Sequence, residues 1–498
     1  MINKYLKNIS WDFLSKLTIA IFLTLQLVRW VILPQYMDIY YHLLTAWGFL
    51  QSGGYSGWDF WQYAPAGRVH IYPPLFHLIL ALFMKLGFSQ VILAKVSEIL
   101  FPWLLLLVTW KFTRKNYSAR LGFFVAVAFF SSFHFYLSLL NHLPSTVALI
   151  LGVLSIGQLF KDRLMRCAIL LTLCFYTHIG VSIYFAIVFF VLGLSSDANK
   201  RKNILKVITI TAILVIPLAI KQLSSLSSVS VLGFNLSERY LIKIKLLEYF
   251  LALMGLVIVF RQRKKYSLIL CLFLSNFVFL FYPYRFFSEE GYYPLIFLVA
   301  IALDSLYDKI RWKNLAIVLC GVIVLLSPTL MLNFKPQEES NFYEITFSDS
   351  AFMGMLFAKG QTLWFPNEYM EAASVIRENS KEGDIIFSTL DIAGLAVSSL
   401  AGRASANALL PEIKESYFFD PLLSSKMIIF TAIDEEEQVN SIASFYRLSL
   451  VGTNKFFKIY KNNNSPIVNK VRRASVPFWL IFIWAIALIL IYKFVKNI

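Results

Sequence analysis

The first hydrophilic stretch of the chain, Met37 to His77, concentrates side chains that transfer protons or hold cations. Asp38 begins it in "MDIYYHL", a few residues after a long apolar run. A carboxylate at that point is costly unless it is solvated, paired or used. It could take a proton from a hydroxyl or hold a divalent cation. A solvated loop Asp, or one that caps the next helix, is the structural alternative; we expect Asp38 to be functional.

Histidines are unevenly distributed along the chain, because all six lie at or before residue 178. Taken singly, each could cap a helix or meet lipid headgroups. Taken together with Asp38, they favour a shared polar site. In "HIYPPLFH", the two prolines fix the start of a helix and would aim His70 and Tyr72 into the loop before it. The histidines are His42, His70, His77, His134, His142 and His178.

One arginine much later in the chain is a candidate phosphate ligand. Arg285, in "YPYRFFSEEGYYPL", keeps its charge at any working pH and can grip a phosphate through two parallel hydrogen bonds. Two alternatives stay open from the residues alone. Arg285 could extend to the membrane interface, or Glu289 and Glu290 could neutralise it.

The elements that must position these residues are membrane helices. The chain has 498 residues, of which 58% are hydrophobic and only 15% charged, whereas soluble domains carry about 25% charged residues. Apolar runs recur at lengths near the ~20 residues that cross a bilayer. We predict an α-helical polytopic membrane protein of about 12 spans. The predicted spans are 17–33, 91–111, 121–139, 143–160, 165–178, 180–195, 204–221, 243–260, 266–284, 292–307, 314–332 and 476–494.

The loops between these runs carry most of the net charge of +17. Lys and Arg in alternate short loops follow the positive-inside rule and do not form a nucleic-acid groove. The pattern predicts a multi-pass protein of the cell membrane with both termini in the cytoplasm. The polar stretch around Asp38 and the loop at Arg285 then lie outside. The four cysteines fall in apolar runs and indicate no disulfide.

Domain boundaries follow from the same pattern. Residues 1–332 form a transmembrane domain with a first outer loop at 34–90, in which the segment from His70 includes a short helix at the membrane interface. Residues 333–475 form a small extracytoplasmic α/β domain, since "NEYMEAASVIREN" reads as an amphipathic helix, and "DIIFSTL", "KMIIFTAI" and "FFKIYKN" read as strands. Residues 476–498 hold the last transmembrane helix.

Four of these motifs, in this order, resemble the C-type glycosyltransferase superfamily, which includes the oligosaccharyltransferase catalytic subunit and the protein O-mannosyltransferases. "MDIYYHL" resembles its catalytic Asp motif, and "HIYPPLFH" resembles the Pro-Pro helix after the first loop. "THIG" at His178 and the "YRF…YYPL" segment at Arg285 also resemble its members. The resemblance spans about residues 1–310 and implies that family's fold, with an external domain.

The resemblance implies transfer of a sugar from a polyprenyl-phosphate-linked donor to a glycan, lipid or protein acceptor outside the membrane, with contacts to membrane lipid. It implies Asp38 as catalytic base or metal ligand, with a divalent cation (Mg²⁺ or Mn²⁺) held by Asp38 and His142. The implied substrate-binding residues are His42, His70, Tyr72, His77, Asn141, His142, His178 and Arg285.

The chain also departs from the family pattern. It lacks the Trp-Trp-Asp-Tyr-Gly motif that reads glycosylation sequons, and Asn141 and His142 stand where the family has a second acidic pair. Sequon-directed transfer of a whole oligosaccharide is therefore not expected. The alternative functions are a transporter or flippase of a lipid-linked substrate and a membrane scaffold. Few ionisable residues lie inside the spans, and no Gly- or Pro-broken helix pair is evident, which disfavours a transporter.

Overall fold

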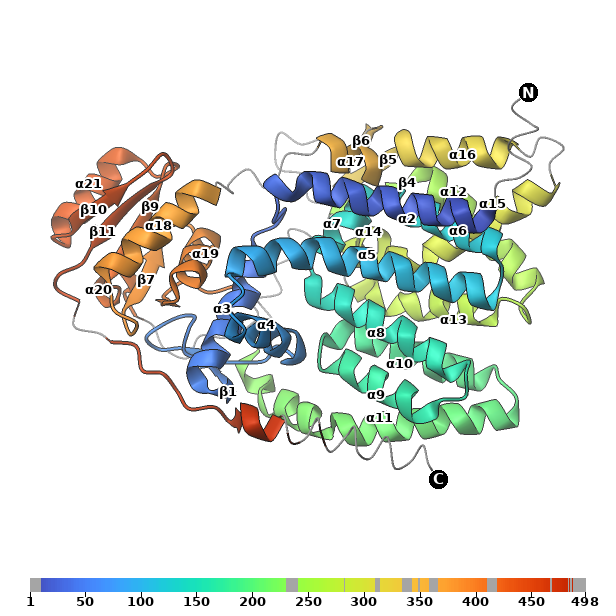
Figure 1. Cartoon of the computed structure of the whole chain (residues 1–498), viewed down its shortest axis with the longest axis horizontal. Coiled ribbons are helices and arrows are strands. Elements are labelled where there is room, and N and C mark those ends of the chain that lie inside the picture. The colour runs from blue at the N-terminus through green and yellow to red at the C-terminus, as the bar shows by residue number, and fades with distance from the viewer. Residues whose placement is uncertain are drawn as a thin grey trace. The chain divides into compact units, whose positions relative to one another are not determined.

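A computed structural model gives the fold of the chain (Figure 1). It describes residues 10–229, 241–281, 283–309, 314–333, 343–347, 350–357, 366–409, 419–465, 468–481, 483 and 486. The chain divides into two compact units. The first comprises Met1–Leu33, Ser97–Ile216 and Leu236–Lys359, and the second comprises Pro34–Val96, Pro217–Asn235 and Gly360–Ile498.

The first unit is built from apolar helices. Three helical segments are long and apolar enough to cross a membrane, namely Trp11–Val31, Gln90–Asn116 and Ala198–Ser224, and several shorter apolar helices accompany them. This confirms a largely helical, multi-pass membrane architecture, whereas the predicted number of about 12 spans stays a prediction. The helices of the unit are α2 (Trp11–Val28), α5 (Gln90–Asn116), α6 (Ala119–Phe129), α7 (Phe133–Asn141), α8 (Leu143–Leu159), α9 (Leu164–Phe175), α10 (Ile179–Leu194), α11 (Ala198–Ser224), α12 (Leu246–Arg261), α13 (Ser267–Ser275), α14 (Pro283–Ser288), α15 (Tyr293–Lys309), α16 (Asn314–Leu325) and α17 (Ala351–Phe357), of which α5 and α11 continue into the second unit.

The predicted span at 121–139 is not one continuous helix, because α6 and α7 meet at an angle of 78°. Two serines explain the break. The Ser131 hydroxyl donates to the Ala128 carbonyl, and the Ser132 hydroxyl accepts the Phe135 amide as the N-cap of α7. Side-chain bonds of this kind compete with helix continuation.

The predicted span at 314–332 also needs correction. Helix α16 ends at Leu325, and the chain continues as strand β5 (Thr329–Asn333). This strand lies between β4 (Leu241–Lys245) and β6 (Tyr343–Thr346) in an antiparallel sheet. Most of the predicted last span, 476–494, lies outside the described residues.

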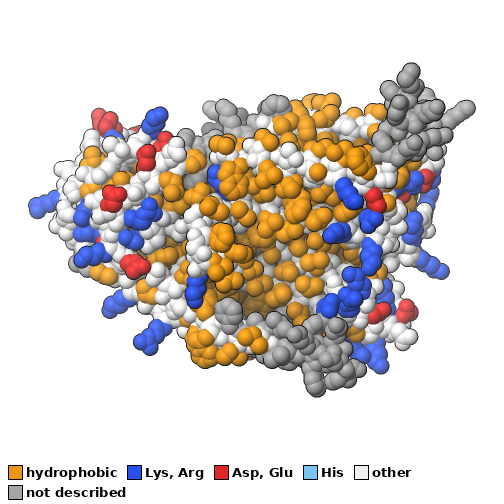
Figure 2. Space-filling view, in the orientation of Figure 1, with side chains coloured by type: hydrophobic (Ala, Val, Ile, Leu, Met, Phe, Trp, Pro, Cys, Tyr) orange, Lys and Arg blue, Asp and Glu red, His pale blue; other side chains and the backbone are white. Residues whose placement is uncertain are grey.

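Polar loops of the first unit gather at one end of its helices. Arg120 at the start of α6 pairs with Asp304 and Asp308 near the end of α15, with distances of 2.5 and 2.6 Å. Tyr117 stacks on Tyr266 with ring centroids 5.7 Å apart. Figure 2 shows hydrophobic side chains over the long helices and Lys and Arg side chains near that end. This distribution matches the basic loops that the sequence analysis grouped together.

The second unit contains a five-stranded sheet of strand order β10-β11-β9-β7-β8. Strand β7 pairs in parallel with β8 and β9, and the β9–β11 and β11–β10 pairs are antiparallel. Every residue of β9 is buried, as expected for a strand covered on both faces. The strands are β7 (Ile385–Ser388), β8 (Ala404–Ser405), β9 (Met427–Thr431), β10 (Ser449–Thr453) and β11 (Phe457–Lys461).

Helices cover both faces of this sheet. Tyr369 of α18 (Pro366–Asn379) packs edge-on against Phe457, with centroids 4.8 Å apart. Val439 of α21 (Glu436–Phe445) packs in a cluster with Ile428 and Tyr460, whose side chains point to the other face. The predicted helix "NEYMEAASVIREN" and the strands "DIIFSTL", "KMIIFTAI" and "FFKIYKN" are therefore confirmed as parts of a C-terminal sheet domain.

The segment after α2 belongs to the same unit as this sheet. It contains α3 (Asp38–Ser52), β1 (Gly54–Tyr55), β2 (Trp58–Asp59), β3 (Arg68–Val69) and α4 (Leu75–Lys85). Backbone bonds run from the Tyr63 amide to the Asn407 carbonyl, from Ala64 to Ser405 and from Ser405 to Trp61, with lengths of 3.2, 2.9 and 3.0 Å. Residues 61–64 thus extend the sheet at the β8 edge, and helix α3 packs on α19 (Asp391–Ala401).

Candidate active site

Asp38 is the first residue of α3 and is partly buried. The N-terminus of a helix carries partial positive charge from its unpaired amides, which favours an ionised carboxylate there. His42 follows one turn later and lies on the same face of the helix. The sequence-predicted catalytic carboxylate therefore stands at a structural position that stabilises negative charge.

A buried cluster of imidazoles lies in the same unit. His70 Nδ1 lies 2.7 Å from Asp59 Oδ1, and both side chains are at most 1% exposed. His42 Nδ1 lies 2.9 Å from His77 Nε2. The Tyr72 ring packs against both members of that pair, with centroids 5.5 and 5.4 Å away. The structure thus brings together four of the residues that the sequence analysis proposed for substrate binding.

The hydrogen bonds of this cluster constrain its protons. Burial, followed by the nearby His42 and His70, holds the pKa of His77 well below its usual range. A neutral His77 therefore shares a single N–H···N bond with His42. Asp59 Oδ1 accepts a hydrogen bond from His70 Nδ1, so the other polar atom of that ring is Nε2. That nitrogen is buried and has no hydrogen-bond partner among the residues that the structure describes.

We expect Asp59→Ala to destabilise the second unit by ~1.5–3 kcal/mol, because the buried His70 loses a charged hydrogen-bond acceptor. Thermal unfolding of the detergent-solubilised protein measures the change. Glu371→Ala, an exposed acid on α18, is the matched control and should leave the midpoint unchanged. Equal midpoints for Asp59→Ala and the parent chain would contradict a stabilising role for this contact.

Sequence reasoning did not select Asp59 as a site residue. Strand β2 pairs with β3 so that Asp59 lies opposite Arg68, two residues before His70. The hairpin is short, and each strand has only two residues. Its pairing could not be read from periodicity, because alternation needs about four or more residues to be visible.

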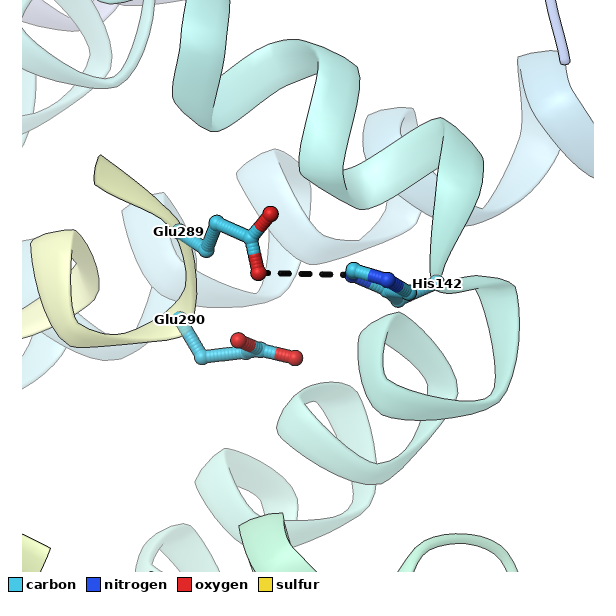
Figure 3. A group of neighbouring side chains, drawn as sticks. All are labelled: His142, Glu289 and Glu290. Carbon is cyan, nitrogen blue, oxygen red and sulfur yellow. Dashed lines mark ion pairs between the residues drawn. The ribbon is translucent and has the colours of Figure 1, made fainter. Parts of the chain in front are cut away.

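A second polar cluster lies in the first unit, at the helix ends opposite the basic loops. His142 separates α7 from α8, and Glu289 and Glu290 follow α14 (Figure 3). His142 Nδ1 lies 3.5 Å from Glu289 Oε2. One ligand atom from each of the three residues lies within 4.8 Å of the other two, which is close enough for them to hold one metal ion.

Arg285 joins this cluster. Its Nε atom lies 3.9 Å from Glu289 Oε2, and Nη1 lies 3.6 Å from Glu290 Oε1. These are ion-pair distances, but they are longer than hydrogen bonds. Both oxygens of Glu290 are buried without a hydrogen-bond partner among the described residues. Neutralisation of Arg285 by the two glutamates, which the sequence left open, is thus seen in the structure.

Charges within the cluster shift its titration. Burial, with Arg285 next, lowers the pKa of His142 to about 4. Burial is the largest single effect on Glu290 and opposes its ionisation, but Arg285, His142 and His178 together outweigh burial and lower the pKa of that carboxyl to about 2. At neutral pH, His142 is therefore a neutral ligand and Glu290 an anion, which are the forms that bind metal.

Asn141 and His178 lie around the same cluster. Asn141 Nδ2 is 3.4 Å from His142 Nε2. His178 caps α10, because its Nδ1 accepts the Val181 amide at 3.2 Å. His178 also lies close enough to Arg285 and Glu290 to interact with their charges. The capping bond stabilises the start of α10, and the role of His178 in substrate binding stays a prediction.

The predicted site residues therefore fall into two groups. Asp38 and the histidines of the first outer segment belong to the second unit, and the residues around His142 and Arg285 belong to the first. The expectation that Asp38 and Arg285 serve one substrate stays a prediction, and so does the metal pair of Asp38 and His142.

No family model and no curated protein matches the sequence. Solved structures do match the fold. An oligosaccharyltransferase of Archaeoglobus fulgidus, in a complex with Zn and sulfate, aligns with TM-score 0.51 and 12% identity over 89% of this chain and 73% of its own. The archaeal oligosaccharyltransferase AglB from the same organism, in complex with an inhibitory peptide and a dolichol-phosphate, aligns with TM-score 0.53 and 12% identity over 91% and 74%.

A third structure is ArnT from Cupriavidus metallidurans bound to undecaprenyl phosphate. It aligns with TM-score 0.51 and 11% identity over 90% of this chain and 98% of its own. At such low identity the alignments establish the fold and no residue role. The resemblance to the C-type glycosyltransferases is confirmed at that level, and the chain has the fold shared by AglB and ArnT.

Proposed function

We propose that this protein is a membrane glycosyltransferase that moves a sugar from a polyprenyl-phosphate-linked donor to an acceptor on the extracytoplasmic side. The observation that carries the proposal is the fold, which aligns over about nine-tenths of the chain with proteins bound to dolichol-phosphate and undecaprenyl phosphate. Two polar clusters in a largely apolar helical protein support it. The protein would contact membrane lipid, and we propose no nucleic-acid partner.

The reaction needs one base and one phosphate ligand. The acceptor hydroxyl oxygen forms a bond to the anomeric carbon, while the bond from that carbon to the phosphate oxygen breaks. Asp38 takes the hydroxyl proton. The lipid phosphate leaves with the electron pair, and Arg285 stabilises its negative charge. Because phosphate is a good leaving group, no separate strong acid is needed.

A divalent cation fits the cluster of His142, Glu289 and Glu290. The two carboxylates and the one guanidinium give the cluster a formal charge of −1 beside a neutral imidazole. A net negative charge there opposes the binding of a phosphate. The buried Glu290 oxygens without hydrogen-bond partners among the described residues suit a cation ligand. Mg²⁺ or Mn²⁺ there would add the positive charge that lets Arg285 engage the lipid phosphate.

We expect His142→Ala to weaken Mn²⁺ binding by about 100-fold. Titration calorimetry of the purified protein measures this, with His134→Ala, another histidine of the first unit, as the control. Because His142 and Glu290 release no proton at pH 6–8, affinity should stay flat over that range and fall only as pH approaches 4. If His142→Ala and the parent chain bind Mn²⁺ equally well, this cluster is not the metal site.

Transport of a lipid-linked substrate is the second candidate function, favoured by the 78° break between α6 and α7. Discontinuous helices line the substrate sites of many transporters. Purified protein incubated with a radiolabelled polyprenyl-phosphate sugar and a membrane extract separates the two functions. A glycosyltransferase yields a labelled acceptor and free lipid phosphate, whereas a flippase leaves the donor intact and only moves it between leaflets in vesicles.

A further inference from the structure

A pocket of about 390 Å³ opens in the second unit, apart from the histidine cluster. Its size falls in the ~300–1,000 Å³ range of small-ligand sites. Its walls combine aromatic, apolar and basic side chains, and within the described part of the chain no acidic residue lines it. The lining residues are Trp58, Phe60, Pro65, Ala66, Val468, Lys470 and Arg472.

Hydrogen bonds hold the two walls of this pocket together. One wall is the segment of the first outer loop from Trp58 to Ala66, and the other is the chain from Val468 to Arg472. Asn469, between the basic residues and Val468, is buried and donates its Nδ2 to the Phe60 carbonyl at 2.9 Å. The backbone amide of Asn469 donates to the Gly383 carbonyl at 2.8 Å. The pocket is thus a preformed feature of the unit.

Both cations of the pocket are available to a ligand. The side chains of Lys470 and Arg472 are exposed, and neither forms an ion pair with any acid in the described part of the chain. The Arg472 guanidinium lies 4.4 Å from the centroid of the Trp58 ring. Stacking on an indole fixes the plane of a guanidinium without using its N–H donors, so they remain free to bind an anion.

We propose that this pocket binds an anionic sugar residue of the acceptor, a glycan that carries carboxylate or phosphate groups. Because Phe60 is only 2% exposed, the aromatic contact falls to Trp58, whose partly exposed indole suits the C–H face of a sugar ring, while Lys470 and Arg472 pair with the charge of the sugar. The rigid aromatic wall favours a sugar over an anionic lipid headgroup. This inference rests on the proposed transferase function, since it assigns the acceptor class of that reaction.

The test is binding of fluorescent tetragalacturonate, glucose 6-phosphate and neutral maltotetraose to the full-length protein in detergent. We expect the double variant Lys470→Glu/Arg472→Glu to weaken binding of at least one anionic probe by about tenfold or more. Binding of that probe to the parent chain should also weaken as NaCl is raised, because the contacts are exposed. Maltotetraose should bind weakly to every variant. If the charge-reversed variant loses binding of tetragalacturonate, the pocket recognises carboxylate; if it loses binding of glucose 6-phosphate, the pocket recognises phosphate.

The matched control is Lys381→Glu/Lys455→Glu, which reverses two exposed charges of the same unit outside the pocket. It should bind like the parent chain. Equal binding by both double variants, a preference for maltotetraose, or loss of binding only to phosphatidylglycerol vesicles would overturn the proposal. Donor cleavage by the pocket variant in the membrane extract is measured in parallel. If cleavage persists while anionic probes never bind, the transferase function stands and the acceptor assignment fails.

Discussion

Replacement of Asp38 by alanine is expected to lower the rate of sugar transfer by about 10²- to 10⁴-fold, the range that general-base catalysis contributes. Asp38 begins α3, where the helix N-terminus favours its ionised form. Removal of the carboxylate leaves the acceptor hydroxyl without a proton acceptor in the transition state. The effect should therefore appear in kcat, with little change in the KM for the donor.

Single-turnover transfer from a radiolabelled polyprenyl-phosphate sugar measures this loss. Asp391→Ala is a close control, because Asp391 also begins a helix of the second unit, α19, and is exposed. This control tests whether removing any acid at the start of a helix in this unit lowers the rate of transfer. Asp38→Asn keeps the size of the side chain but removes its charge, and it should be as inactive as Asp38→Ala. Normal turnover by a folded Asp38→Ala protein would remove the catalytic assignment and with it the proposed mechanism.

Sequence patterns predicted local structure well where one element carries the whole signal. The amphipathic helix α18 and the strands β7, β9 and β11 follow from periodicity and apolar runs of a few residues. The break after α6 was missed, because a hydropathy window averages over Ser131 and Ser132. Only their bonds to the neighbouring backbone reveal that they end one helix and begin another.

Pairings between distant segments could not be predicted. The contact of residues 61–64 with the edge strand β8 joins parts of the chain that are hundreds of residues apart, through backbone bonds that carry no residue signature. The Asp59–His70 contact could not be predicted either, because it depends on the pairing of two strands of only two residues each. The Arg285–Glu289 contact was open to prediction, since residues four apart lie close together along a helical turn.

We expect Arg285→Ala to raise the KM for the lipid-linked donor by about 10- to 150-fold, equivalent to the ~1.5–3 kcal/mol of a charge-assisted hydrogen bond. The structure also predicts a loss of stability. Glu290 is 1% exposed, and without Arg285 its buried carboxylate loses a counter-charge 3.6 Å away, which typically costs about 3 kcal/mol or more. One substitution therefore produces two defects of different origin.

A second substitution separates these defects. In Arg285→Ala/Glu290→Gln the buried charge is removed together with its counter-charge, so the thermal midpoint should recover most of the loss. The KM for the donor should not recover, because no cation has returned to bind the phosphate. Arg285→Lys, which keeps the charge but not the two-pronged geometry, should have an intermediate KM. If the double variant instead regains the parent KM, Arg285 serves only to neutralise Glu290, and the lipid phosphate must be held by other groups.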